Sequence, residues 1–254
     1  MTLSNTTKIN QLVSSKYSRG VFFSEWLVSN GYSNQLIADY RKGGWLETVC
    51  RGVMKRPGTV LSALVVVGCY NEQISHSIRV AAHSALELAG YNHYVPMGKP
   101  TLMVAQHDKK MNAWTKFDGY DANIKVFSSN MFHTDNLVEY NREGITVSAS
   151  SPEQAFMECL LLAPSQYAYM DLYYIMEQMT SLRADVVQLL LEECKNNRVK
   201  RLFLYMAEKA GHYWFDMLDI PKVDLGSGKL KLADGGVYIP KYKITIPKEL
   251  QEYE

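Results

Sequence analysis

The sequence predicts an α+β fold in which an N-terminal winged helix-turn-helix is followed by a mixed α/β C-terminal domain with several helices. Three observations support this: a helix, helix, glycine turn, helix and hairpin pattern in the first 58 residues, short β-prone runs in the middle, and a series of helices after residue 151. With 254 residues, 47% of them hydrophobic, the chain can form one large or two modest cores. We predict an N-terminal region at 1–95, with its winged-helix core at about 6–58, and a C-terminal domain at 96–254.

The first part of the chain contains three short helical patterns. The first covers residues 6–15, and the second begins with Ser24 as its cap and stops at Asn30-Gly31. A third helix begins after the cap residue Ser33 and runs to about Lys42, where a pair of glycines ends it. The tight turn between the second and third helices is typical of a helix-turn-helix.

A basic hairpin follows these helices. Two β-prone runs, Trp45–Val49 and Val53–Lys55, are joined near Arg51-Gly52, and Arg56-Pro57-Gly58 ends the segment. The first 58 residues carry eight basic and three acidic residues, whereas the remainder carries 19 basic and 23 acidic residues. This asymmetry favours a nucleic-acid-binding N-terminal region attached to a neutral or acidic body.

The outer face of the third helix presents amides and cations, the groups that recognise purine edges in the major groove. We expect replacement of Arg41 or Gln35 to relax base preference and cost about 1–3 kcal/mol. Replacement of Lys55 should weaken binding to all sequences and flatten its salt dependence. The alternatives are a helical cap with solvated cations and a protein-docking module. The predicted DNA-binding residues are Ser33, Asn34, Gln35, Arg41, Lys42, Arg51, Lys55 and Arg56.

The middle of the chain has a mixed pattern. We predict a buried strand at Val60–Tyr70, a helix at Ser77–Ala89, and further strands at Leu102–Gln106, Ile124–Phe127 and Ile145–Ala149.

The last hundred residues begin with a strong helix-start signal. Ser151 is a cap residue, Pro152 suits the first helical position, and the Gln154 side chain is expected to reach back as a capping box. The predicted helices are Pro152–Leu162, Asp171–Met179, Arg183–Asn196 and Val199–Ala210. The predicted strands of the tail are Val223–Leu225, Lys229–Leu232 and Val237–Ile246, the last broken by Pro240, with Gly226-Ser227-Gly228 as a hairpin turn.

A second basic cluster lies where two of these helices meet. It consists of Lys195, Arg198, Lys200 and Arg201. Such a run is usually a solvated face that partly compensates the charge at a helix end. The other interpretation is a contact surface for nucleic acid or an acidic partner.

The sequence offers no support for catalysis, a metal site or a cofactor. His76 and His83 lack further ligands at a zinc spacing. The Gly226–Lys229 segment is not a phosphate-binding loop, and Ser227 lacks the paired carboxylates that a nucleotidyltransferase needs. An enzyme with an unrecognised site would have to use Asp234 or His212.

The expected location is the cytoplasm, with no membrane association. Four cysteines are scattered without a CxxC pair, which is typical of reduced thiols. The start lacks the apolar core of a signal peptide. The longest apolar run is about half of the ~20 residues that cross a bilayer.

An ordered set of short fragments extends over most of the chain. The fragments are Phe22–Gly58, with Gly43-Gly44-Trp45-Leu46 and Arg51-Gly52-Val53; Ile74-Ser75-His76; Ser84–Gly90; Tyr94-Val95-Pro96; Ser151–Ala155; Val199–Tyr205; Trp214; Asp224–Lys229; and Tyr242–Lys248. Together they resemble the AbiEi family, antitoxins of type IV toxin–antitoxin systems first associated with abortive phage infection.

The resemblance implies a winged helix that binds double-stranded DNA at inverted repeats in the promoter of its own operon and represses it. It also implies a C-terminal domain that neutralises a nucleotidyltransferase-like toxin, which would be a functional partner and not a stable physical one. The family provides no catalytic residues to carry over. The alternative is a winged-helix transcription regulator that responds to a small effector and has no toxin partner.

Overall fold

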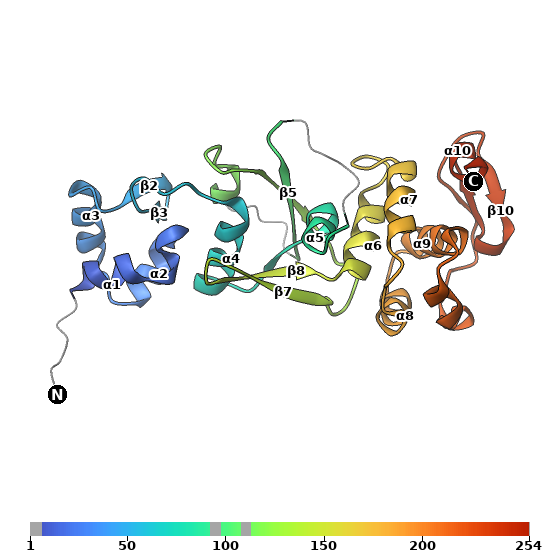
Figure 1. Cartoon of the computed structure of the whole chain (residues 1–254), viewed down its shortest axis with the longest axis horizontal. Helices are drawn as coiled ribbons and strands as arrows, with labels where there is room; N and C mark the ends of the chain where they lie inside the picture. Colours follow the sequence, from blue (N-terminus) through green and yellow to red (C-terminus); the bar gives the residue numbers. More distant parts are fainter. Residues whose placement is uncertain (1–6, 92–97, 108–112, 254) are drawn as a thin grey trace. The chain divides into compact units, whose positions relative to one another are not determined.

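The structure, a computed structural model, describes residues 7–91, 98–107 and 113–253 (Figure 1). It is α+β, as predicted, and its described strands form three sheets. Among the described helices, none has the length and apolar character needed to cross a membrane. Backbone contacts divide the chain into unit 1, with residues 1–80, 96–128 and 138–149, and unit 2, with residues 81–95, 129–137 and 150–254.

Unit 1 begins with a winged helix-turn-helix, which confirms that part of the predicted fold. The hydroxyl of Ser33 accepts the backbone N–H of Leu36 at 3.2 Å and caps the third helix, as predicted. The three strands form a sheet in the order β1-β3-β2. The elements are α1 (Lys8–Ser14), a 3₁₀ turn η1 (Lys16–Arg19), β1 (Phe22–Phe23), α2 (Ser24–Ser29), α3 (Asn34–Lys42), β2 (Glu47–Cys50) and β3 (Val53–Lys55).

The predicted strand at Val60–Tyr70 is wrong, because this segment contributes to the helix α4 (Ala63–Gln73). The helix is buried on almost every side, so it has no polar face and no 3.6-residue periodicity to distinguish it from a buried strand. Its start is fixed from far along the chain, since the Asp121 carboxylate accepts the Ala63 N–H at 2.7 Å.

The predicted helix at Ser77–Ala89 is wrong in its first half. The chain forms a strand, β4 (Ile78–Val80), and only then a helix, α5 (Ala82–Leu88). Ala82 has φ +50°, so the backbone changes direction between the two elements. The Ala82 N–H is held by the buried carboxylate of Glu158 at 3.0 Å.

Strand β4 is central in a five-stranded sheet with the order β6-β5-β4-β8-β7. Three of its strands confirm the predicted ones, whereas β7 was missed because most of its residues are polar or exposed. The strands are β5 (Thr101–Gln106), β6 (Asn123–Ser128), β7 (Leu137–Arg142) and β8 (Ile145–Ser150), and the 3₁₀ turn η2 covers Ala113–Lys116.

Unit 2 contains the helices predicted after residue 151. The Ser151 hydroxyl accepts the Gln154 N–H at 3.3 Å, but the reciprocal half of the predicted capping box is absent. The side-chain amide oxygen of Gln154 accepts the Asn136 N–H at 2.6 Å instead, and the Asn136 carbonyl accepts the Ser151 N–H. The helices are α6 (Pro152–Leu162), α7 (Tyr169–Gln178), α8 (Ala184–Glu193) and α9 (Asn197–Ala210).

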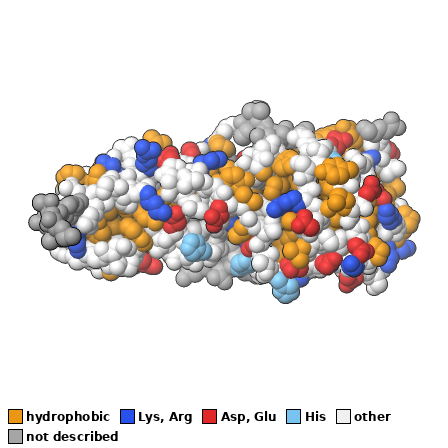
Figure 2. Space-filling view, turned by 60° about the horizontal axis from the view of Figure 1, so that its bottom comes forward, with side chains coloured by type: hydrophobic (Ala, Val, Ile, Leu, Met, Phe, Trp, Pro, Cys, Tyr) orange, Lys and Arg blue, Asp and Glu red, His pale blue; other side chains and the backbone are white. Residues whose placement is uncertain are grey.

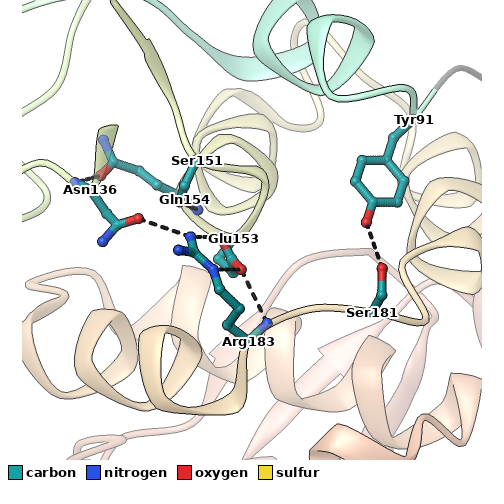
Figure 3. A network of polar contacts seen from close by, with 7 residues as sticks. All are labelled: Tyr91, Asn136, Ser151, Glu153, Gln154, Ser181 and Arg183. Carbon is teal, nitrogen blue, oxygen red and sulfur yellow. Dashed lines mark hydrogen bonds and ion pairs between the residues drawn. The ribbon is translucent and has the colours of Figure 1, made fainter. Parts of the chain in front are cut away.

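An ion pair between the buried Glu153 and the half-exposed Arg183 joins the start of α6 to the start of α8 (Figure 3). Glu153 is 2% exposed, and its two oxygens accept N–H groups of the Arg183 guanidinium, each at 3.0 Å. Burial by itself raises the pKa of Glu153, but the hydrogen bonds from Arg183 outweigh burial and hold this pKa below its usual value.

The pair makes the stability of unit 2 depend on pH. Because the folded-state pKa of Glu153 is lowered, its contribution is present above the usual pKa of a glutamate and is lost as the pH falls through the folded value. We expect Arg183→Ala to cost about 2–3 kcal/mol of unfolding free energy at pH 7 and much less in acid. Urea denaturation at several pH values measures this; an equal cost at all pH values would contradict it.

The tail corrects the predicted hairpin. Residues 223–225 form no strand, and Gly226-Ser227-Gly228 lies in a loop, because the following strand pairs in parallel with a strand farther along the chain. The elements are the 3₁₀ turns η3 (Tyr213–Met217), η4 (Ile220–Lys222) and η5 (Pro240–Tyr242), the strands β9 (Leu230–Lys231), β10 (Val237–Ile239) and β11 (Ile244–Ile246), and the helix α10 (Lys248–Glu252).

Candidate nucleic-acid interface

The turn between α2 and α3 sets the position of the recognition helix. Gly31 has φ +82°, a left-handed conformation that glycine adopts without strain. The next residue, Tyr32, is 6% exposed, and its hydroxyl donates to the Lys8 carbonyl of α1 at 3.0 Å. The turn is therefore anchored to the first helix, and α3 begins from a fixed point.

Helix α3 has one buried side and one exposed side. Ile37 faces the core, whereas Asn34, Gln35, Arg41 and Lys42 are exposed. The two cations lie in the last turn, where they also complement the partial negative charge of the helix end. The structure thus places the predicted amides and cations on the solvent side of one helix.

The wing is tied back to the helix-turn-helix. Gly52, at the tip of the β2–β3 hairpin, has φ +79°, and its carbonyl accepts the Ser24 N–H at 2.8 Å. Ser24 is the first residue of α2 and Phe23 occupies the cap position, so the prediction that Ser24 caps this helix is wrong. The contact fixes the tip that carries the exposed Arg51.

A hollow of about 530 Å³ lies between the recognition helix and the wing. Asn34 and Arg41 line it from α3, whereas Thr48 and Arg51 line it from the hairpin. Cys50 also lines this hollow, and burial raises the pKa of its thiol, which favours the neutral form. A second hollow of about 510 Å³ is lined by Ala38, Arg41, Lys42, Leu46, Glu47 and Thr48.

Four of the predicted contact residues are available to a ligand. The side chains of Arg41, Lys42, Arg51 and Arg56 have no hydrogen-bond or ion-pair partner within the described parts of the chain, and all but the half-buried Arg56 are exposed. These cations lie at the end of α3 and along the hairpin. An anionic ligand there would not have to displace an existing partner.

The other predicted contact residues already have partners. The Gln35 amide donates to the Asp39 carboxylate at 3.0 Å, and the Ser33 hydroxyl is used as the helix cap. The Lys55 ammonium donates to the Thr59 carbonyl at 2.9 Å and lies 3.3 Å from the Glu47 carboxylate. Lys55 is therefore less available to a phosphate than Arg51.

Trp45 is an exposed residue in this region that the sequence analysis did not assign to the site. It follows the two glycines at the end of α3 and is 53% exposed. The sequence pattern predicts Trp45 as the first residue of the β-prone run Trp45–Val49, whereas strand β2 begins at Glu47. Its position after the Gly43-Gly44 turn is the signal that could have marked it.

The second basic cluster does not form a surface. Lys200 is 4% exposed and Arg201 is 1% exposed, so both the solvated-face and the contact-surface interpretation are wrong for them. Their side chains bind backbone carbonyls, with Lys200 donating to Asp224 at 2.8 Å. Arg198 donates to the carbonyls of Leu161 and Ala163, whereas Lys195 is exposed.

One face of the molecule carries charges of both signs. On the face that Figure 2 shows, Lys and Arg side chains are interspersed with Asp and Glu side chains. Within the described residues, no group of three or more His, Cys, Asp or Glu side chains is arranged to hold a metal ion. The region between α3 and the wing therefore remains the strongest candidate site.

Comparisons with known proteins agree with this architecture. Residues 5–97 match the family model described as the N-terminal domain of an AbiEi antitoxin and transcriptional regulator. Residues 99–247 match the model described as a transcriptional regulator, AbiEi antitoxin of a type IV toxin–antitoxin system. A search of curated proteins gave no match.

Solved structures include one of a protein of similar fold. It is the crystal structure of the RV2827C protein from Mycobacterium tuberculosis, with a TM-score of 0.61 and 16% sequence identity over 94% of this chain and 92% of that chain. The two family models cover most of the chain and confirm the resemblance that the sequence fragments carry. The chain therefore belongs to the AbiEi family of transcriptional regulators and antitoxins of type IV toxin–antitoxin systems.

Proposed function

We propose that the winged helix binds double-stranded DNA in the promoter of the chain's own operon, at inverted repeats, and represses transcription. The observation that carries this proposal is the set of unpaired cations around the hollow between α3 and the wing. A recognition helix reads base edges in the major groove, and the adjacent wing cations bind phosphates. We assign base contacts to Asn34 and Arg41, and phosphate contacts to Arg51 and Arg56.

The same proposal includes a division of labour. The C-terminal domain, which we assign to residues 96–254, neutralises a nucleotidyltransferase-like toxin in the cytoplasm without forming a stable complex with it. The family membership supports the antitoxin role, and the described residues of the C-terminal part present no metal-binding cluster. DNA binding and antitoxicity would then depend on different residues of one chain.

Operator binding tests the site residue by residue. We expect Arg41→Ala to cost about 1–3 kcal/mol of binding free energy and to relax base preference. Arg51→Ala should weaken binding to all DNA sequences and lower the slope of log K against log salt concentration by about 1. Lys55→Ala should have a smaller effect, because Glu47 and Thr59 already hold this ammonium. Fluorescence anisotropy with the upstream DNA of the operon provides the measurement, with the exposed Lys195→Ala as the control.

If neither arginine variant altered operator binding, the assignment of the DNA-binding site to α3 and the wing would be wrong. If Arg41→Ala lowered the affinity for the operator and for unrelated DNA equally, only the assignment of base recognition to α3 would be wrong.

Growth rescue tests the division of labour. The toxin gene product is induced in a host with the full-length chain or with its Arg41→Ala/Lys42→Ala/Arg51→Ala variant. We expect rescue by both forms and loss of promoter repression in the variant. The fragment of residues 96–254 alone is a poor test, because it lacks the central strand β4 and helix α5. Rescue by neither form would contradict the antitoxin role.

A further inference from the structure

The C-terminal sheet of unit 2 has one face that carries exposed and half-buried side chains. Tyr238 of β10 pairs with Thr245 of β11, and Thr245 pairs in turn with Lys231 of β9. Because side chains alternate along a strand, these three lie in one row on the same face of the sheet. Tyr238 is 37% exposed, and Lys231 is exposed beside it.

The opposite face of this sheet belongs to the core. Ile244 and Ile246 of β11 are fully buried, and β11 contacts helix α9. The sheet therefore presents its second face, with Tyr238, Thr245 and Lys231, to solvent. We call this surface, together with Lys229 and Lys243 next to it, the lysine face.

The lysine face is strongly cationic for its size. Residues 229–248 contain five lysines and one acidic residue, Asp234, in a chain whose net charge is only +1. Asp234 lies 2.5 Å from the Lys231 ammonium and offsets one of these charges, and Glu208 pairs with Lys241. Lys229 and Lys243 have no carboxylate partner within the described residues.

The cations and the aromatic ring are in contact. The Lys229 ammonium lies 5.1 Å from the centroid of the Tyr238 ring, so its side chain extends across the face. Lys243 is exposed at the start of β11, and its carbonyl accepts the Leu230 N–H at 2.9 Å, which places it beside Lys229. The Lys229 ammonium and an exposed ring therefore share one small surface, and the exposed Lys243 lies next to it along the backbone.

We propose that the lysine face binds single-stranded nucleic acid. Lysines along a strand neutralise successive phosphates, and an exposed aromatic ring on a sheet gives an unpaired base a surface on which to stack. A duplex hides its bases in the stack, so it would use the lysines but not the ring. This surface lies in unit 2 and extends the proposed function with a second nucleic-acid site, independent of the winged helix.

The test uses the full-length chain with Arg41→Ala and Arg51→Ala, two substitutions chosen to weaken DNA binding by the winged helix. We call this double variant the silenced chain. Probes are a fluorescein-labelled RNA of about 20 nucleotides, the DNA strand of the same sequence, and the corresponding duplex. We expect Tyr238→Ala to weaken both single strands about tenfold and the duplex little, and Tyr238→Phe to retain binding. Lys229→Ala/Lys243→Ala should lower the salt slope for single strands by about 1.4.

Two further variants sharpen the test. Asp234→Asn removes the one acidic group of the segment and should strengthen binding about twofold. Lys195→Ala, which removes an exposed lysine elsewhere in unit 2, should leave binding unchanged. All these positions are at the surface, so equal unfolding curves show that the variants are folded.

The proposal is overturned if the silenced chain binds neither single strand, or if Tyr238→Ala and the double lysine variant bind as tightly as their parent. Binding of polyglutamate but not of nucleic acid would reassign the face to an acidic protein. The unmodified chain is measured on operator DNA in parallel, so that a failure of the winged helix and a failure of the lysine face are distinguished.

Discussion

Replacing Arg201 with methionine is expected to lower the unfolding free energy of unit 2 by about 3–5 kcal/mol. Arg201 lies in α9 and is 1% exposed. Methionine fills a similar volume but donates no hydrogen bond, so the variant isolates the loss of the guanidinium. The cost is larger than that of an ordinary surface ion pair, which is about 0–1 kcal/mol.

The guanidinium of Arg201 binds four backbone carbonyls from two separate segments of unit 2. It donates to the carbonyls of Leu225, Gly226 and Gly228 in one loop and of Lys243 at the start of β11. Each buried carbonyl left without a donor costs about 1–3 kcal/mol. The loop and the start of β11 are therefore held together by one side chain.

Lysine at this position is expected to restore little of the lost stability, because an ammonium group is a compact charge and cannot span four separate carbonyls as a planar guanidinium does. Urea denaturation provides the measurement, with the fluorescence of Trp214, which is 1% exposed in unit 2, contributing to the signal. Lys195→Met is the matched control on the exposed part of the same basic cluster. A loss below about 1 kcal/mol for Arg201→Met would show that water replaces the guanidinium.

Arg201 also shows where sequence reasoning reached its limit. A cluster of four basic residues predicts an exposed surface, since charged side chains are rarely buried. The carbonyls that accept hydrogen bonds from the buried Arg201 lie more than 20 residues away, at Leu225 and Lys243. No local sequence signal identifies them. Lys229 of the lysine face was likewise invisible, because its relation to Tyr238 depends on a parallel pairing across the tail.

The winged helix could be predicted because its signals are local. A serine cap before α3, glycines at the two turns and a short hairpin are all set by residues within a few positions of each other. The cations at Arg41 and Arg51 could be placed on the surface for the same reason. Whether each one was free could not be predicted, since the partner of Lys55 lies across the hairpin at Glu47.

Helix α4 was predicted as a strand, and Gly68 within it leads to the second large effect. Gly68 is buried where α4 crosses β8, and a β-carbon there would lie 2.7 Å from the Thr146 carbonyl oxygen and 2.6 Å from a methyl group of Ile145. Alanine is the better helix former by about 1 kcal/mol, so propensity alone predicts a gain in stability. Overpacking against backbone costs about 1–3 kcal/mol or more, and a strand in the middle of a sheet cannot shift without losing its ladder.

We therefore expect Gly68→Ala to lower the unfolding free energy of unit 1 by about 2 kcal/mol and Gly68→Val by more. The matched control is Gly228→Ala, where an added β-carbon meets no atom within 4 Å. The winged helix rests on α4 through Gln73, whose amide binds the Phe23 N–H at 2.9 Å and the Val21 carbonyl at 2.7 Å, so operator affinity should fall with stability. Urea denaturation and fluorescence anisotropy on the same samples measure stability and operator affinity. If Gly68→Ala were more stable than the parent, strand β8 would shift to make room for the β-carbon, and helix propensity would outweigh overpacking.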